Sequence, residues 1–304
     1  MLTPAFVAAV VLAAPAAAGT PEDALAAVQD RGYVRCGMHR SGVGLAEIRT
    51  DGAWAGYFVE LCRAIALAAI GDSDAIRVQE VDDLSAALAL EAREVDVVLS
   101  SIRPVDAAVD PGIVFLSPLI EDQQMLVSFL DGVGGVDDLP PMARICASGH
   151  PTMQANLRRA LAGRADSVRV MTYASVDGVF NAFFSRRCDA LSHHHYAILA
   201  QSLLRSPQRT PMWRSQVVLG PVAFVPSVRG DDAGWIAVVD AAVRAALHRP
   251  GPVPEPIPES VRDGLAARVQ TIANSRTAIF DRTLGHMGGQ GFPPPPDLPL
   301  PSGS

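Results

Sequence analysis

The chain has 304 residues, of which 49% are hydrophobic and 19% are charged, and its formal net charge is −7 with a pI near 5.5. This length and hydrophobic content suffice for one large domain or for two lobes of ordinary size. The acidic balance argues against a nucleic-acid partner, because no basic stripe is present to neutralise phosphates. All 25 basic residues are arginine, so lysine chemistry in a Schiff base or a P-loop is excluded.

The first 18 residues predict export. An apolar stretch from Ala5 to Ala14 precedes an alanine-rich run in which Ala16 and Ala18 form an A-x-A cleavage signal. Such a segment is typical of a secretory signal peptide and is too short for a membrane-spanning helix. We therefore expect a signal peptide over residues 1–18 that is cleaved near Ala18, and a periplasmic mature protein.

Four cysteines, Cys36, Cys62, Cys146 and Cys188, lie far apart in the chain. None belongs to a C-x-x-C pair, which argues against a zinc ribbon or a thioredoxin-type site. An even number of cysteines in an exported chain suggests disulfides instead. Three pairings are open, and the order along the chain favours Cys36 with Cys62 and Cys146 with Cys188.

The first half of the mature chain alternates helical and extended patterns. The periodicity predicts, in chain order, helix Pro21–Arg31, strand Tyr33–Met38, a helix from near Phe58 to Ile70, strand Ile76–Val81, helix Leu84–Glu91 and strand Val95–Leu99. This rhythm indicates a parallel sheet covered by helices.

The rhythm is repeated after an extended segment. The predicted elements are extended Met125–Leu130, strand Ala143–Ala147, helix Met153–Leu161, strand Val168–Thr172, helix Val176–Phe184, strand Cys188–Ser192, a helix from Tyr196, strand Val222–Val228 and helix Trp235–Leu247. Two α/β lobes that face each other would form a cleft at the carboxyl ends of their strands, where ligands bind in open α/β sheets. Two proline-rich segments, Pro250–Pro258 and Phe292–Ser304, predict a rigid connector and an extended tail.

Short motifs over nearly the whole mature chain carry a family resemblance. They are Val34–Gly37, Trp54–Ala66, Glu94–Val97, Phe115–Pro118, Asp122–Gln124, Ile145–Cys146, Arg187–Ala190, Val228–Asp232 and Ile279–Gly285. In this order and spacing they resemble the periplasmic amino-acid-binding (family 3 solute-binding) proteins of ABC importers, in particular the general L-amino-acid-binding branch. The four cysteines fall where that branch has cysteines, which supports one disulfide in each lobe.

The resemblance implies an α/β type II periplasmic-binding-protein fold, in which two lobes are joined by two crossover strands that act as a hinge. We expect lobe 1 over residues 19–120 and 196–304, and lobe 2 over residues 121–195. The crossovers are expected near Leu119–Val127 and Leu191–His195. Closure over a ligand is then a hinge motion.

An amino-acid site of this family uses an arginine for the carboxylate, an acid for the ammonium group and an aromatic ring. The sequence departs from this pattern. Asp106 or Ala107 stands at the position of the arginine, and Arg103 at the neighbouring threonine position could serve as an anion clamp instead. His194 stands at the position of the acid, and Leu45 at that of the ring.

The helix start of lobe 2 is altered too. It reads Gly149-His150-Pro151-Thr152 in place of the family's Gly-Thr-Thr, and a proline there removes one amide donor from the anion cradle. We expect ordinary L-amino acids to bind poorly, because their charged groups would lose partners on burial. The ligand-binding residues predicted for the cleft are His39, Leu45, Ser101, Arg103, His150, Thr152 and His194.

The run His193–His195 is open to several interpretations: hydrogen-bonded hinge residues, an anion site or a metal site. If the run is a strand, His193 and His195 face one side and His194 the other. No carboxylate or cysteine is spaced to complete a metal site, so no metal and no cofactor is expected.

These observations predict a non-enzymatic periplasmic protein that captures a small polar or anionic solute and works with an ABC permease. One alternative is an accessory or sensor of an exported redox enzyme system. The other is a dehydratase-like enzyme on the same scaffold, with His194 as a base opposite Glu47 or Asp122.

Overall fold

The computed structural model describes residues 23–82, 85–104, 112–205 and 214–247, together with the single residues 262, 264, 265, 267, 268, 271, 283 and 284. The predicted signal peptide, connector and tail lie outside these residues, as do Asp106 and Ala107. In the described part of the chain, no helix is long and apolar enough to cross a membrane.

One nine-stranded sheet runs through the molecule in the order β4-β1-β5-β11-β7-β10-β8-β9, with β6 paired to β11. Its strands are β1 (Val34–Met38), β4 (Ile76–Glu80), β5 (Val97–Ile102), β6 (Ile113–Phe115), β7 (Ile120–Ser128), β8 (Ala143–Ser148), β9 (Val168–Tyr173), β10 (Ala190–His194) and β11 (Ser215–Arg229). A small antiparallel sheet is formed by β2 (Glu47–Ile48) and β3 (Trp54–Ala55).

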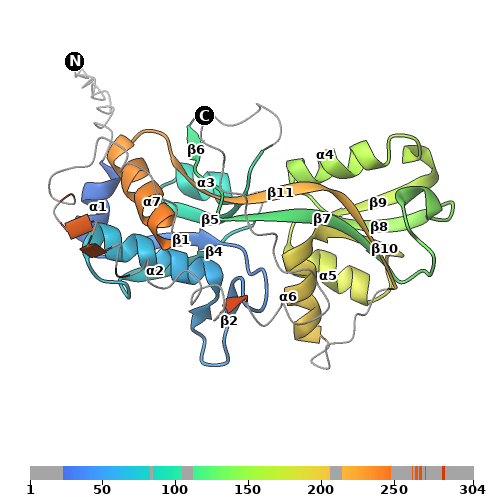
Figure 1. The fold of residues 1–304 in the computed structure, drawn as a ribbon, viewed down its shortest axis with the longest axis horizontal. Coiled ribbons are helices and arrows are strands. Elements are labelled where there is room, and N and C mark those ends of the chain that lie inside the picture. Colours follow the sequence, from blue (N-terminus) through green and yellow to red (C-terminus); the bar gives the residue numbers. More distant parts are fainter. Residues whose placement is uncertain are drawn as a thin grey trace, which may run out of the picture.

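The helices gather at the two ends of this sheet (Figure 1). They are α1 (Ala24–Arg31), α2 (Tyr57–Ile70), α3 (Ser85–Glu91), α4 (Pro151–Ala160), α5 (Val176–Phe184), α6 (His195–Arg205) and α7 (Ala233–Ala246), with 3-10 turns over Val136–Asp138 and Ala165–Ser167. We define the first unit as β1, β4, β5 and β6 with α1, α2, α3 and α7. The second unit is β8, β9 and β10 with α4, α5 and α6.

Each unit is built around parallel strands. In the first unit β1 pairs in parallel with β4 and β5, and in the second unit β8 pairs in parallel with β10 and β9. Helices between the strands make these parallel connections possible. The predicted repetition of an α/β unit is confirmed.

Two long strands connect the units (Figure 1). β11 has 15 residues and pairs with β7 from Ser215 to Phe224 and with β5 from Phe224 to Ser227. β7 also pairs with β10 along its other edge. The predicted first crossover near Leu119–Val127 therefore agrees with β7.

The predicted second crossover at Leu191–His195 was wrong. Strand β10 ends at His194, the helix α6 begins at His195 and packs against β7 and β10, and β11 then crosses back to the first unit. Residues 196–205 therefore lie with the second unit and not with lobe 1, because α6 is needed to cover that end of the sheet. The start of a helix at His195 also breaks the strand alternation that was expected for the histidine run.

The disulfides join the cysteines as predicted. Cys36 on β1 is bonded to Cys62 on α2 with a Cα–Cα distance of 6.3 Å, and Cys146 on β8 is bonded to Cys188 with a Cα–Cα distance of 5.6 Å. Each bond therefore ties a helix or a loop to the central strands of a single unit.

Candidate functional site

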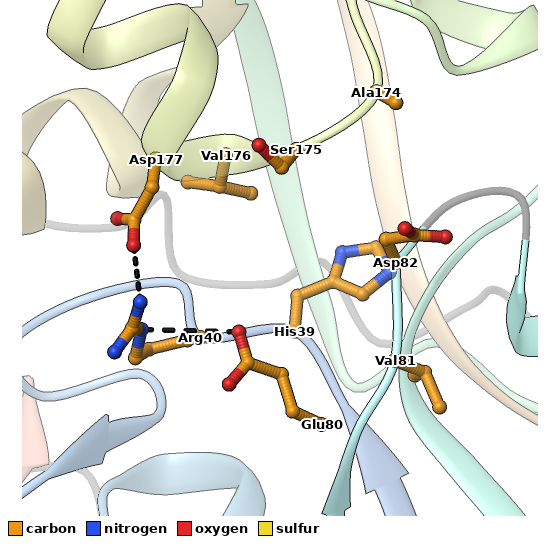
Figure 2. Close-up of a pocket in the computed structure, with 9 residues that line it drawn as sticks. All are labelled: His39, Arg40, Glu80, Val81, Asp82, Ala174, Ser175, Val176 and Asp177. Atoms are coloured by element: carbon orange, nitrogen blue, oxygen red, sulfur yellow. Dashed lines mark hydrogen bonds and ion pairs between the residues drawn. The ribbon is translucent and has the colours of Figure 1, made fainter.

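A cavity of about 210 Å³ lies between the two units (Figure 2). The first unit contributes residues that follow β1 and β4, and the second unit contributes the connection from β9 to α5. Its lining residues are His39, Arg40, Glu80, Val81, Asp82, Ala174, Ser175, Val176 and Asp177. The cavity therefore sits at the carboxyl ends of parallel strands from both units, which is where open α/β sheets bind ligands.

Local hydrogen bonds hold the lining residues in place. The backbone N–H of His39 donates to Ser100 Oγ at 2.8 Å, and the carboxylate of Asp82 accepts from the N–H of Ser85 at 2.8 Å at the start of α3. On the opposite side Ser175 caps α5 by accepting from the N–H of Gly178 at 3.1 Å. The cavity walls are thus fixed by helix caps.

Arg40 links the two units across the cavity (Figure 2). Its guanidinium donates to the carboxylate of Asp177 at the start of α5, and its Nε lies 3.8 Å from Oε1 of Glu80 at the end of β4. These side chains are 40% to 52% exposed. An ion pair this exposed contributes at most about 1 kcal/mol, which makes it a reversible contact between the units.

A second contact between the units involves two predicted ligand residues. The hydroxyl of Thr152, near the start of α4, donates to the carbonyl of Arg103 at 3.0 Å. The guanidinium of Arg103 donates to the carbonyl of Leu116 within its own unit at 2.6 Å. The Arg103 side chain is thus engaged away from the cavity, and its role as an anion clamp stays a prediction.

His150 occupies part of the anion cradle at the start of α4. Its Nδ1 accepts from the N–H of Thr152 at 3.2 Å, and Pro151 at the first helical position has no N–H to donate. Two of the amides that would face an anion at a helix start are therefore absent or already bonded.

Leu45 and Ser101 contribute to the first unit and do not line the cavity. Leu45 is fully buried, and its carbonyl accepts from the N–H of Phe58 at the start of α2. The hydroxyl of Ser101 lies 2.6 Å from the hydroxyl of Ser227 on β11.

His194 and Asp122 form a buried pair that does not line the cavity. Nδ1 of His194 lies 3.4 Å from Oδ2 of Asp122 and accepts from the N–H of Ala197 at 3.2 Å. Asp122 itself accepts from the N–H groups of Gln123 at 2.7 Å and Tyr196 at 2.9 Å. Burial raises the pKa of Asp122 to about 6, and these two backbone donors oppose that rise.

Among the described residues no three side chains of histidine, cysteine, aspartate or glutamate are arranged to hold a metal ion.

The sequence and the fold were compared with known proteins. No protein-family model matches the chain. It is 25% identical over 258 residues to the general L-amino acid-binding periplasmic protein AapJ of Rhizobium johnstonii, covering 81% of this chain and 72% of the relative. It is 27% identical over 247 residues to the glutamate/glutamine/aspartate/asparagine-binding protein BztA of Rhodobacter capsulatus, covering 77% and 70%. The chain is thus distantly similar in sequence to family 3 periplasmic amino-acid-binding proteins of ABC transporters.

A solved structure supports the same fold. An ABC transporter periplasmic binding protein from Brucella ovis, solved with glutathione bound, superposes with a TM-score of 0.73 at 21% identity and covers 87% of this chain and 91% of its own. The α/β type II periplasmic-binding-protein fold predicted for the present chain is thereby confirmed.

Of the seven ligand residues predicted from the sequence, only His39 lines the cavity of the present chain. Sequence reasoning missed Arg40, Glu80 and Asp177. For Arg40 and Glu80 a signal was available, because both lie at or just after the carboxyl end of a predicted strand. Asp177 lies in the first turn of a predicted helix. The pairing of Arg40 with Asp177 carried no such signal, since 137 positions separate them.

Proposed function

We propose that the chain is a periplasmic solute-binding protein that holds a small polar solute between its two units and delivers it to an ABC permease. The observation that carries this proposal is the cavity of about 210 Å³, which is lined by polar residues from both units. Its size is below the about 300 Å³ at which drug-sized pockets begin, so it suits a small molecule. Similar proteins that are named as periplasmic binding proteins, one of them of an ABC transporter, support this proposal.

The arrangement of the two units supports a hinge motion in which they open and close about the strands that connect them. Two strands, β7 and β11, connect the units, and the contacts of Arg40 with Asp177 and of Thr152 with Arg103 span the gap between them. Weak contacts of this kind allow opening, and a solute that touches both walls stabilises the closed form.

Ordinary L-amino acids are poor candidates for this solute. The position of the family's acid is taken by His194, which is 3% exposed and does not line the cavity. Arg103 donates to Leu116, and His150 takes the N–H of Thr152. A buried α-carboxylate without a partner costs about 1–3 kcal/mol, and more because it is charged.

An enzyme on this scaffold is not favoured. The acid–base pair considered for it, His194 with Asp122, does assemble, but both side chains are buried and neither lines the cavity. A catalytic base must reach the proton that it removes. Glu47, the other candidate acid, accepts from the N–H of Gly44 at 3.4 Å.

The test is mass spectrometry of small molecules carried through a non-denaturing purification, followed by calorimetric titration of each molecule found. We expect a small solute that binds reversibly with one-to-one stoichiometry. Micromolar binding of a common L-amino acid would contradict the exclusion of amino acids. Absence of any solute that binds, in extracts or in titrations, would contradict the proposed function itself.

A further inference from the structure

The charges around the cavity are predominantly negative. Among the described residues that line it are three carboxylates, those of Glu80, Asp82 and Asp177, and one guanidinium, that of Arg40. Carboxylates face the cavity from both sides, since Glu80 and Asp82 belong to the first unit and Asp177 to the second (Figure 2). Like charges that meet when a cleft closes repel each other unless a cation lies between them.

Arg40 supplies such a cation in the present arrangement. It donates to Asp177 and lies 3.8 Å from Glu80, so one guanidinium is shared by carboxylates of both units. A solute of either sign has to displace these ion pairs of Arg40. A cation that does so takes over two carboxylate partners, whereas an anion gains one guanidinium and leaves the carboxylates without their cation.

Other donors that an anion would need are engaged elsewhere. The guanidinium of Arg103 donates to the carbonyl of Leu116, the first amide of α4 is lost to Pro151, and the next is bonded to His150. The chain contains no lysine that could replace them.

We infer that the solute is a small organic cation, an amine or a guanidinium compound, that carries no carboxylate beside its cationic group. Its positive group binds between Glu80 and Asp177, where the guanidinium of Arg40 lies in this structure. This inference rests on the proposed function and deepens it, and it replaces the anionic solute that the missing acid at His194 suggested. A cation held by both units favours the closed form, because it binds carboxylates of both walls at once.

Substitution of Arg40 distinguishes a cationic solute from an anionic one. We expect wild-type protein to bind agmatine or putrescine in calorimetric titrations. Arg40→Gln should then bind that cation about threefold more tightly, since a competing ion pair of the exposed kind is gone. Glu80→Gln and Asp177→Asn should each weaken its binding by about tenfold, since each removes a charged partner.

Matched controls separate these effects from general changes in charge. Arg49→Gln alters an exposed arginine on the β2–β3 turn, and Glu121→Gln alters an exposed glutamate on β7; neither residue lines the cavity. Both should leave cation binding within about twofold of wild type. Circular dichroism and melting temperatures verify that each variant is folded.

The inference is overturned if the wild-type protein binds glutarate, phosphate or L-glutamine, loses that binding in Arg40→Gln, and binds neither agmatine nor putrescine. That result would leave the proposed function intact. Failure of every solute in this panel, combined with no solute carried through purification, overturns the proposed function.

Discussion

The Nδ1 atom of His194 lies 3.4 Å from Oδ2 of Asp122, and both side chains are less than 5% exposed. Nδ1 accepts from the N–H of Ala197, and Oδ2 of Asp122 accepts from the N–H of Tyr196. Since β7 carries Asp122 and β10 carries His194, this pair lies where a connecting strand meets the second unit. The protonation state of Asp122 therefore affects the stability of the junction between β7 and β10.

The free energy of unfolding should fall as the pH rises from about 3.8, the unfolded pKa of Asp122, to about 6, its folded pKa. Burial raises the pKa of Asp122 from 3.8 to about 6. The folded chain thus keeps a proton that the unfolded chain has released, and deprotonation costs about 3 kcal/mol between these limits. We expect Asp122→Asn to gain about this much stability relative to wild type between pH 4 and pH 7, measured by urea unfolding.

Asp189 provides a control of opposite sign. Its hydrogen bond from the Arg144 side chain lowers the pKa of Asp189. This contribution is present above the unfolded value of 3.8 and is lost as the pH falls through the folded pKa. Asp189→Asn should therefore lose stability relative to wild type as the pH rises from acid to neutral. A difference that does not depend on pH for Asp122→Asn would contradict the account of the buried pair.

The hydroxyl of Thr152 should favour the closed arrangement of the units. Valine has nearly the same shape but cannot donate to the carbonyl of Arg103. We expect Thr152→Val to weaken closure by about 1 kcal/mol, roughly fivefold in the open-to-closed ratio. Small-angle X-ray scattering should report a larger radius of gyration. Thr172→Val, at an exposed position of β9, is the matched control and should leave the radius unchanged.

Gly56 should tolerate no side chain. Its φ is +119°, and a Cβ there would lie 2.5 Å from the carbonyl oxygen of Leu45. Alanine at this position combines backbone strain with a clash against a neighbouring backbone, so we expect Gly56→Ala to cost at least about 3 kcal/mol of unfolding free energy. Gly52, with φ +81° and no atom within 4 Å of a built Cβ, is the control, and its alanine variant should lose only about 1 kcal/mol. Equal losses would refute the steric argument.

Each disulfide should stabilise its own unit. The bonds close loops with sequence separations of 26 and 42 residues, for which chain entropy predicts about 3.5 and about 4 kcal/mol. Replacing both cysteines of one pair with alanine should lower the unfolding free energy by about these amounts. Because the bonds lie in different units, the double removal should be close to additive. A strongly non-additive result would show that the units do not contribute independently.

The fold was largely predictable because its strands are short apolar runs between helical patterns. Thus β5 and β8 were predicted within a few residues from local sequence alone. The helix predicted from Tyr196 begins one residue earlier, at His195. Its contact with Asp122, which accepts from the N–H of Tyr196 over 74 positions, was not predictable from local sequence. Strand β11 was predicted too short for a similar reason. It passes Gly220 and Pro221 through an irregular register opposite β7, whereas these residues normally end a strand.

The site was less predictable than the fold. The family pattern directed attention to Arg103, Thr152 and His194. The first two do meet across the units, whereas His194 is buried. The position of Glu80 at a strand end agrees with a ligand site, but carboxylates at strand ends are also common on protein surfaces, so this position alone did not single it out. Its role depends on the second unit bringing Asp177 to the opposite wall.

The most direct test of the central claim is a crystal structure of the protein purified under native conditions together with the solute that it carries. We expect density for a small molecule enclosed by His39, Glu80 and Asp177, with its cationic group within hydrogen-bond distance of both carboxylates. A solute bound at another place on the chain, with this cavity filled by side chains, would contradict the claim.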